Sequence, residues 1–381
     1  MFDIVSPEAI RDGRATDAYF ERTRDALEGA GRDPHVVCEV TADQFPDGSF
    51  ETFAGVKDAA HLFEGRDVTV HALGAGQLFD GGPVMRIEGS YLAFAELETS
   101  LLGFLSSASG WATGARRVVS AAGDDVSVLS FGARHVHPST AAALERAALV
   151  GGVDGFSHVA AGEVLGREPS GTMPHALVIC FGRGEQEAAW RAFDDHSPED
   201  VPRIALTDTY SDEVDEALRA AAAVEDLHSV RLDTTGSRRG DFRHIVREVR
   251  WALDDAGHED VGVFVSGGIG ADDVRELRDD VEGFGVGSAI SNAEPVDFAL
   301  DIVERDGESA AKRGKLSGAK QVYRSGEDHV VRPADEPGPT DGRPLLRPLV
   351  EDGEIVRDFS VDEAAKRCAS DAERVGFGDE E

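Results

Sequence analysis

The stretch "VSVLSFGARHVHPSTAAALERAALVGG", residues 126–152, sets the pattern that decides the fold. It contains a short apolar run, a polar loop, and a segment of small and apolar residues at helical spacing. We interpret residues 126–131 as a buried strand and residues 139–152 as a helix. A strand followed directly by a helix is the unit from which parallel α/β sheets are built.

The same alternation continues toward the C-terminus. Helices are expected at 176–180, 212–224, 241–255 and 271–280, the first of them behind Pro174. About six strands alternating with helices predict an α/β fold, most plausibly an irregular parallel α/β barrel, over residues 116–300. The further strands are predicted at GFSHVA (155–160), RIALTD (203–208), SVRLD (229–233), VGVFVS (261–266) and EGFGVG (282–287).

The flanking segments have a different pattern. Residues 1–115 mix strand-like pieces, such as 34–40 and 67–73, with a long helical stretch at 93–119, which predicts an N-terminal α+β sandwich-like domain. Residues 301–381 return to strand and loop, and we expect this C-terminal segment to complete the N-terminal domain. Its last 30 or so residues are acidic and are expected to form a peripheral tail.

The composition excludes several functional classes. The chain has 381 residues, 38 Lys and Arg against 73 Asp and Glu, and a formal net charge of −35. Such a surface repels nucleic acid and anionic membranes, so neither partner is expected. The acidic residues are spread along the chain, which we interpret as adaptation to high salt and hence a salt-adapted organism.

The cysteines and the N-terminal residues indicate the cellular compartment in which the protein is expected. The three cysteines form no CxxC pair, so neither a disulfide framework nor a thiolate zinc site is expected. The first residues, MFDIVSPEAI, lack a basic segment followed by an apolar core. No apolar run approaches the roughly 20 residues that cross a bilayer. We therefore expect a cytoplasmic protein.

Polar residues follow each predicted barrel strand, at the end where barrel enzymes place their active sites. Asp208 and Asp233 end buried strands, and such carboxylates beside a phosphate site commonly hold hydrated Mg²⁺ or face a developing cation. The glycine loops at 267–268 and 285–288 suit a phosphate, to which Arg238 and Arg239 add bidentate donors.

A histidine follows the loop Ser-Gly-Thr-Met-Pro. Pro174 suits the first turn of a helix, and Ser170 and Thr172 are expected to cap that turn. His175 would then stand at a helix start that favours an anion. An ordinary histidine at a helix end is the alternative.

Six motifs, in order, resemble the nicotinate phosphoribosyltransferase branch of the type II phosphoribosyltransferase superfamily, and a seventh resembles a helix signature of the whole superfamily. The similarity covers roughly residues 10–325 and includes the Glu98–Thr113 helix signature. The remaining motifs are TDAYF (16–20), SFGARH (130–135), GTMPH (171–175), LTDTY (206–210), LDTTGSRRG (232–240) and FVSGGI (264–269).

The resemblance implies an enzyme that makes nicotinate mononucleotide and pyrophosphate from nicotinate and phosphoribosyl pyrophosphate, for NAD biosynthesis by salvage. Nicotinate would stack on Phe131 and on Tyr19 of a neighbouring subunit, with Arg134 holding its carboxylate. His175 would be phosphorylated by ATP, coupling ATP hydrolysis to synthesis. A homodimer or trimer of dimers with shared active sites is implied.

The remaining roles follow from the same resemblance. Asp208 and Asp233, catalytic together with His175, would position ribose hydroxyls, Mg²⁺ or the oxocarbenium-like carbon. Mg²⁺ and ATP are the expected cofactor and co-substrate, and zinc is not expected because only Cys368 follows the barrel. The other substrate-binding residues are Thr172, Tyr210, Ser237, Arg238, Arg239, Gly267, Gly268, Gly287 and Ser288.

Two alternatives remain open. The first is quinolinate phosphoribosyltransferase, which shares the helix signature; there an arginine that contacts the extra carboxylate stands where this chain has Ser107. The second is a non-catalytic, ligand-sensing barrel. His135 also stands where the nicotinate branch usually has a second arginine, and its role is open.

Overall fold

The computed structural model describes residues 2–42, 50–199, 201–233 and 240–378. The chain divides into two compact units. Unit 1 comprises Met1–Thr113, Val150–Gly152 and Glu294–Glu381, and unit 2 comprises Gly114–Leu149 and Val153–Ala293. Each unit is described separately below.

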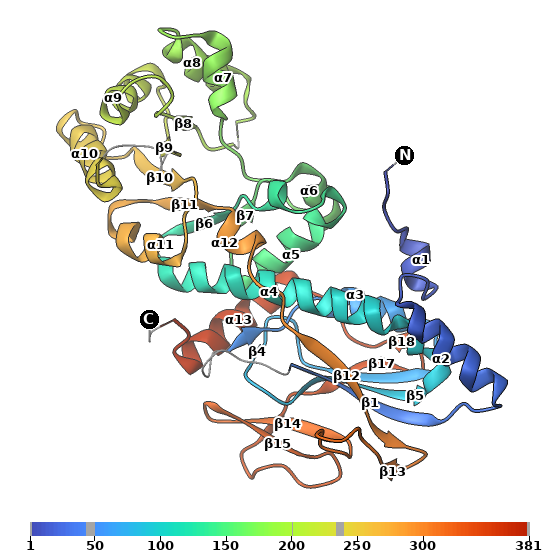
Figure 1. Ribbon diagram of the computed structural model, residues 1–381. Helices are drawn as coiled ribbons and strands as arrows, with labels where there is room; N and C mark the ends of the chain where they lie inside the picture. Colours follow the sequence, from blue (N-terminus) through green and yellow to red (C-terminus); the bar gives the residue numbers. More distant parts are fainter. Residues whose placement is uncertain (1, 43–49, 200, 234–239, 379–381) are drawn as a thin grey trace. The chain divides into compact units, whose positions relative to one another are not determined.

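Unit 2 is built on a six-stranded parallel sheet, in the order β7-β6-β11-β10-β9-β8 (Figure 1). This parallel half-barrel confirms the α/β fold class predicted from the sequence. The strands are β6 (Ser127–Ser130), β7 (Gly155–Phe156), β8 (Ile204–Leu206), β9 (Ser229–Leu232), β10 (Gly262–Ser266) and β11 (Gly283–Val286).

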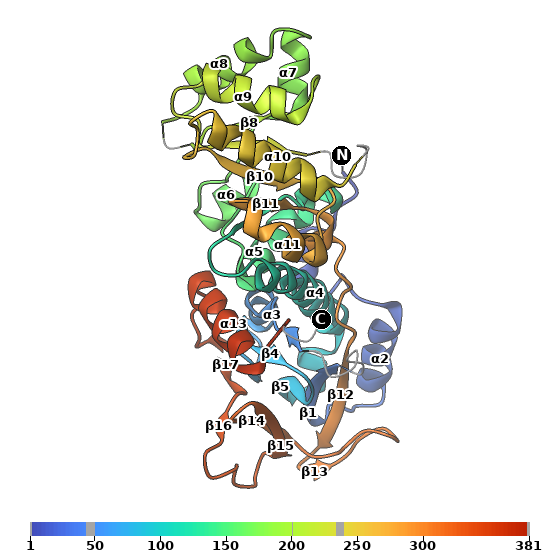
Figure 2. The ribbon, with the colours of Figure 1, turned by 90° about the vertical axis from the view of Figure 1, so that its left-hand side faces the viewer.

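Helices connect these strands. In Figure 2 the chain runs from α7 through α8, α9 and α10, and consecutive members of this series pack against one another. The helix predicted at 176–180 is present as α7. The helices are α5 (Ala141–Gly151), α6 (Val159–Leu165), α7 (His175–Phe181), α8 (Gln186–His196), α9 (Glu213–Ala223), α10 (Phe242–Asp255), α11 (Ala271–Leu277) and α12 (Ser288–Ser291), with 3₁₀ turns at Ala133–His135, Pro138–Thr140 and Arg278–Asp280.

A glycine fixes how the strand ends approach one another. A Cβ on Gly285 of β11 would lie 2.3 Å from the Phe131 ring, which follows the neighbouring strand β6. No real contact is that short, so the bare backbone of β11 is what allows the ring to lie against it. The aromatic ring is thereby held at the C-terminal edge of the sheet.

Two local expectations are wrong. The strand predicted at 155–160 ends at Phe156, because the His158 side chain accepts the amide of Ala161 and starts α6. Pro174 is the N-cap of α7 rather than part of its first turn, and no side chain caps that helix. The Thr172 hydroxyl instead accepts a hydrogen bond from Arg231.

Unit 1 is dominated by an antiparallel seven-stranded sheet, in the order β13-β12-β1-β5-β3-β17-β18. Two smaller sheets pair β2 with β4, and β14 with β15 and β16. The strands are β1 (His35–Ala42), β2 (Glu51–Thr52), β3 (Val68–Ala72), β4 (Leu78–Phe79), β5 (Pro83–Ser90), β12 (Phe298–Arg305), β13 (Glu308–Ser309), β14 (Lys320–Ser325), β15 (Asp328–Pro333), β16 (Arg343–Pro344), β17 (Arg347–Glu351) and β18 (Glu354–Ile355).

The C-terminal segment returns to this sheet, as predicted. Strand β12 pairs with β1, and β17 pairs with β3. The final segment is not peripheral, because α13 (Val361–Val375) buries Cys368 completely and Asp371 almost completely. Asp371 forms an ion pair with Arg324 at 2.5 Å, which fixes α13 to β14.

The other helices of unit 1 are α1 (Pro7–Arg11), α2 (Ala18–Gly29) and α3 (Val56–Phe63), with 3₁₀ turns at Tyr91–Ala93 and Ala95–Leu97. Helix α4 (Glu98–Ala122) is one continuous element, as its signature predicts. Within the described ranges, none of the helices has both the length and the apolar character needed to span a membrane.

Candidate functional site

The C-terminal ends of β8 and β9, with the start of α7, bring three predicted catalytic side chains together. Asp208 follows β8 and Asp233 follows β9, and the strands are parallel neighbours. The Asp233 amide donates to Asp208 Oδ2 at 2.8 Å. His175 Nε2 lies 3.7 Å from Asp208 Oδ1 and 3.6 Å from Asp233 Oδ2. Two strand ends and one helix start thus form a single cluster.

His175 is held from both sides of its ring. Its Nδ1 lies 3.1 Å from the Thr209 hydroxyl, while Nε2 faces the two carboxylates. The hydrogen bond with Asp233 raises the pKa of His175; burial opposes that shift, and the charge of Asp208 adds to it. A positive imidazolium between two acids is therefore favoured in the absence of a ligand.

Asp233 accepts hydrogen bonds from side chains of three different segments. Arg231 Nη2 donates to Asp233 Oδ1 at 2.9 Å, and the Ser266 hydroxyl donates to the same oxygen. Burial alone would raise the pKa of Asp233, but His175, Arg231 and Ser266 together hold it well below its usual range. The carboxylate therefore stays ionised across the whole physiological range of pH.

Arg231 is the residue of this cluster that sequence reasoning missed. Its guanidinium donates to Ser266 Oγ at 2.8 Å and to Thr172 Oγ1, and it lies 5.4 Å from the Phe131 ring centroid. It thereby joins β9, β10, the loop before α7 and the aromatic ring after β6. The available signal was a cation inside the otherwise apolar strand SVRL, where an unpaired charge would be costly.

The two glycine loops follow the last two strands of the sheet, β10 and β11. Gly267 and Gly268 have φ of 94° and 78°, a conformation that side chains disfavour. A Cβ on Gly267 would lie 2.0 Å from the Asp233 carbonyl oxygen, so this loop touches the acidic cluster. Gly287 precedes α12, whose first residue is Ser288. The positive φ angles give the Gly267–Gly268 loop a backbone geometry that suits phosphate oxygens.

The remaining predicted residues have different surroundings. Tyr19 belongs to unit 1, where its side chain is 56% exposed. Arg134 lies in the exposed 3₁₀ turn after Phe131. His135 Nδ1 lies 2.9 Å from the Ser291 hydroxyl, so it bonds within the fold. Ser237, Arg238 and Arg239 lie outside the described residues.

Tyr210 is connected to the cluster only through its loop. It lies two residues after Asp208, and the Arg183 guanidinium stands 5.3 Å from its ring centroid. Within the described ranges no group of three or more His, Cys, Asp or Glu side chains converges as a metal site.

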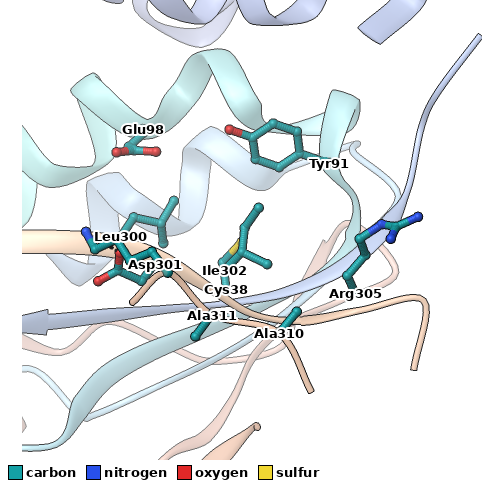
Figure 3. A pocket seen from close by; sticks show the side chains of 10 residues that line it. Cys38, Tyr91, Glu98, Leu300, Asp301, Ile302, Arg305, Ala310 and Ala311 are labelled. Atoms are coloured by element: carbon teal, nitrogen blue, oxygen red, sulfur yellow. Dashed lines mark ion pairs between the residues drawn. The ribbon is translucent and has the colours of Figure 1, made fainter. Parts of the chain in front are cut away.

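Unit 1 contains a separate cavity of about 400 Å³ (Figure 3). In Figure 3, Glu98 and Tyr91 face Cys38 and residues of β12. Burial and the charge of Asp301 raise the pKa of Glu98 to about 7. Asp301 is itself paired with Lys312 at 2.6 Å. The cavity has no glycine loop comparable to those of unit 2, and we take the unit 2 cluster as the functional site.

Comparison with protein families gives two matches that follow one another along the chain. Residues 17–109 match the model described as "Quinolinate phosphoribosyl transferase, N-terminal domain". Residues 111–301 match "Quinolinate phosphoribosyl transferase, C-terminal domain". Together they include both the superfamily helix and every described residue of the acidic cluster.

Among solved structures, a nicotinate-nucleotide pyrophosphorylase from Pyrococcus furiosus is 45% identical, with a TM-score of 0.94 and 98% of each chain covered. Human nicotinic acid phosphoribosyltransferase is 22% identical, with a TM-score of 0.80 over 94% of this chain and 93% of that one, and shares the fold. A nicotinate phosphoribosyltransferase of Mycobacterium tuberculosis is 31% identical over 337 residues, which is 83% of this chain and 69% of that protein.

These matches overturn one expectation. The sequence motifs predicted an ATP-coupled nicotinate phosphoribosyltransferase with a phosphorylated His175. That assignment is wrong, because both family models describe the quinolinate enzyme and the 45% identical structure is a nicotinate-nucleotide pyrophosphorylase. The short motifs are shared widely enough to identify the superfamily, but they did not identify the branch.

Proposed function

This chain belongs to the quinolinate phosphoribosyl transferase family, and from that premise we propose that it transfers phosphoribose from phosphoribosyl pyrophosphate to quinolinate. The pyridine nitrogen forms a bond to the sugar carbon as the bond to pyrophosphate breaks. One ring carboxyl group then leaves as carbon dioxide, and a proton takes its place. The products are nicotinate mononucleotide, pyrophosphate and carbon dioxide.

One observation carries the proposal. Two carboxyl groups, those of Asp208 and Asp233, stand at adjacent strand ends with the His175 imidazole within 3.7 Å of both. Positive charge develops on the sugar carbon when pyrophosphate leaves, and fixed negative groups beside it lower the barrier. His175, together with Arg231 and Ser266, lowers the pKa of Asp233, which favours a charged Asp233 before the substrate arrives.

In this proposal, different residues bind the phosphate groups and the pyridine ring. The loops at Gly267–Gly268 and at Gly287 would receive the phosphate groups through backbone amides. Phe131 would stack on the pyridine ring. Arg134, three residues later, would bind one carboxylate through its forked donors.

Quinolinate has a second carboxylate, which needs a second cation. Arg231 is the candidate, because its guanidinium lies over the ring of Phe131. Its Nε and Nη1 atoms are used by Ser266, Thr172 and the Met173 carbonyl. Its Nη2 atom donates once, to Asp233, and its second hydrogen has no partner among the described residues. The same guanidinium that carries this hydrogen lies over the Phe131 ring. An N–H donor beside an aromatic ring suits a flat dicarboxylic acid.

Magnesium fits the donors present. Asp208 and Asp233 offer only oxygen, and Mg²⁺ is commonly bound by one or two carboxylates together with substrate phosphates. When bound, the ion would make pyrophosphate a better leaving group. The proposal also keeps Tyr19 as a residue that a neighbouring subunit of a homo-oligomer would place over the pyridine.

The test is a panel of substrates followed by mass spectrometry. Folded protein in high-salt buffer receives phosphoribosyl pyrophosphate, Mg²⁺, and either quinolinate or nicotinate, each with and without ATP. We expect nicotinate mononucleotide from quinolinate, with no need for ATP, and none from an Asp233→Asn control. Product from nicotinate but not from quinolinate would refute the proposal. Binding without any product would favour a ligand-sensing protein.

A further inference from the structure

A single carboxylate organises the loop that follows β8. Glu216 lies on α9 and is completely buried. The amide of Thr209 donates to its Oε2 at 2.9 Å, and the amides of Tyr210 and Ser211 donate to its Oε1 at 2.8 Å each. Three consecutive backbone donors directly after Asp208 therefore converge on one side chain.

The same carboxylate is connected to the segment after α7. Gln186, at the start of α8, donates from Nε2 to Glu216 Oε1 at 3.2 Å. The Gln186 side-chain oxygen accepts the amide of Gly184 at 2.8 Å. Both side chains are buried, so water does not compete for these bonds. Glu216 thus fixes two loops at once.

The loop held by Glu216 contacts α7 at both of its ends. At the first residue of α7, His175 Nδ1 lies 3.1 Å from Thr209 Oγ1. Just beyond its last residue, the Arg183 guanidinium stands 5.3 Å from the Tyr210 ring centroid. Because Thr209 and Tyr210 are bonded to Glu216 through their amides, the position of α7 depends on that carboxylate.

We propose that Glu216 is a positioning residue of the phosphosugar site: it sets the loop that aligns Asp208 with His175, and it touches no substrate. This inference rests on the proposed function, since it concerns the site for phosphoribosyl pyrophosphate. Both side-chain oxygens are required as acceptors, because together they accept all four donors. The amide of a Gln substitution offers one accepting oxygen and turns a donor toward the remaining N–H group.

The test variant is Glu216→Gln. We expect the dissociation constant for phosphoribosyl pyrophosphate, measured by calorimetry with Mg²⁺, to rise at least about tenfold, and kcat to fall as well. We also expect hydrogen exchange at the three loop amides to accelerate about tenfold or more. A partly unfolded sample lowers the number of binding sites, but it leaves the dissociation constant of the folded molecules unchanged.

The matched control is Glu187→Gln on the same pair of helices. Glu187 of α8 pairs with Arg219 of α9 at 2.6 and 2.8 Å, and Arg219 lies one helical turn after Glu216. This control should lose stability and keep the wild-type dissociation constant and exchange rates. If Glu216→Gln keeps both wild-type values, or if Glu187→Gln changes them equally, Glu216 has no positioning role.

If Glu216→Gln does not fold, Gln186→Met provides the second variant. It removes one donor to Glu216 and leaves the carboxylate in place, so a smaller change in the same direction is expected, and wild-type behaviour would overturn the inference. The exchange rates test the role of Glu216 even if quinolinate proves not to be the substrate. Failure of the proposed function and failure of this inference are thereby distinguished.

Discussion

Replacing Arg231 with Lys tests whether the guanidinium, and not merely a positive charge, organises the site. Arg231 bonds Ser266 at 2.8 Å, Asp233 at 2.9 Å and the Thr172 hydroxyl from three different nitrogens. A lysine has one nitrogen and loses at least two of these bonds. At about 1.5 kcal/mol for each bond to a charged group, the loss is about 3 kcal/mol. That corresponds to a decrease of about 100-fold in kcat/KM.

The assay is the initial rate of pyrophosphate release with quinolinate and Mg²⁺ in high salt. Arg203→Lys is the control, because the side chain of Arg203 is 14% exposed, against 13% for Arg231, and it bonds only structural groups. The control should lower the melting temperature and leave kcat/KM within about threefold of wild type. An Arg231→Lys enzyme within that same range would refute the reasoning.

Three further predictions concern other parts of the chain. Burial raises the pKa of Glu145 from 4.5 to about 7 in the folded protein. Between these two values the unfolded chain is ionised while the folded protein keeps its proton, so stability falls as pH rises. Denaturant unfolding at pH 5 and pH 8 should show stability falling with pH by about 3 kcal/mol more in wild type than in Glu145→Gln, and equal slopes would contradict this. Gly267→Ala places a Cβ 2.0 Å from the Asp233 carbonyl oxygen and should lower kcat/KM about tenfold or more. Gly29→Ala, which has open space around it, should leave kcat/KM unchanged, and equal kcat/KM values for the two variants would refute the predicted clash. Arg357→Met removes donors to backbone carbonyls beside β3 and β17 and should cost about 3 kcal/mol in thermal unfolding with unchanged kcat, so a large loss of kcat would show that the effect is not confined to stability.

The fold could be predicted because its signal is local. Short apolar strands, each followed by polar residues and a helical segment, predict a parallel sheet with its site at one edge. Asp208 and Asp233 were identifiable because each ends such a strand, and His175 because it follows Pro174 in an unusual loop. Those three side chains do meet at one edge of the sheet.

The rest could not be predicted because it depends on contacts between distant residues. Arg231 is one cation in a strand, and its hydrogen-bond partners come from segments up to 59 residues away. Glu216 is one of 73 acidic residues, and only the fold reveals three amides pointing at it. The acidic composition of the C-terminal segment concealed α13, in which Ala364, Cys368 and Ala372 are buried. The choice of pyridine acid rests on the arrangement of cations in space, which short motifs do not specify.

The most direct test of the central claim is the ratio of carbon dioxide to pyrophosphate released when quinolinate is the only pyridine present. In the proposed reaction, two carboxylates stabilise a cationic sugar beside a site for a dicarboxylic acid. The predicted ratio is therefore about one, and neither product is expected from Asp233→Asn. Pyrophosphate without carbon dioxide, or no reaction with quinolinate while nicotinate is consumed, would contradict the account.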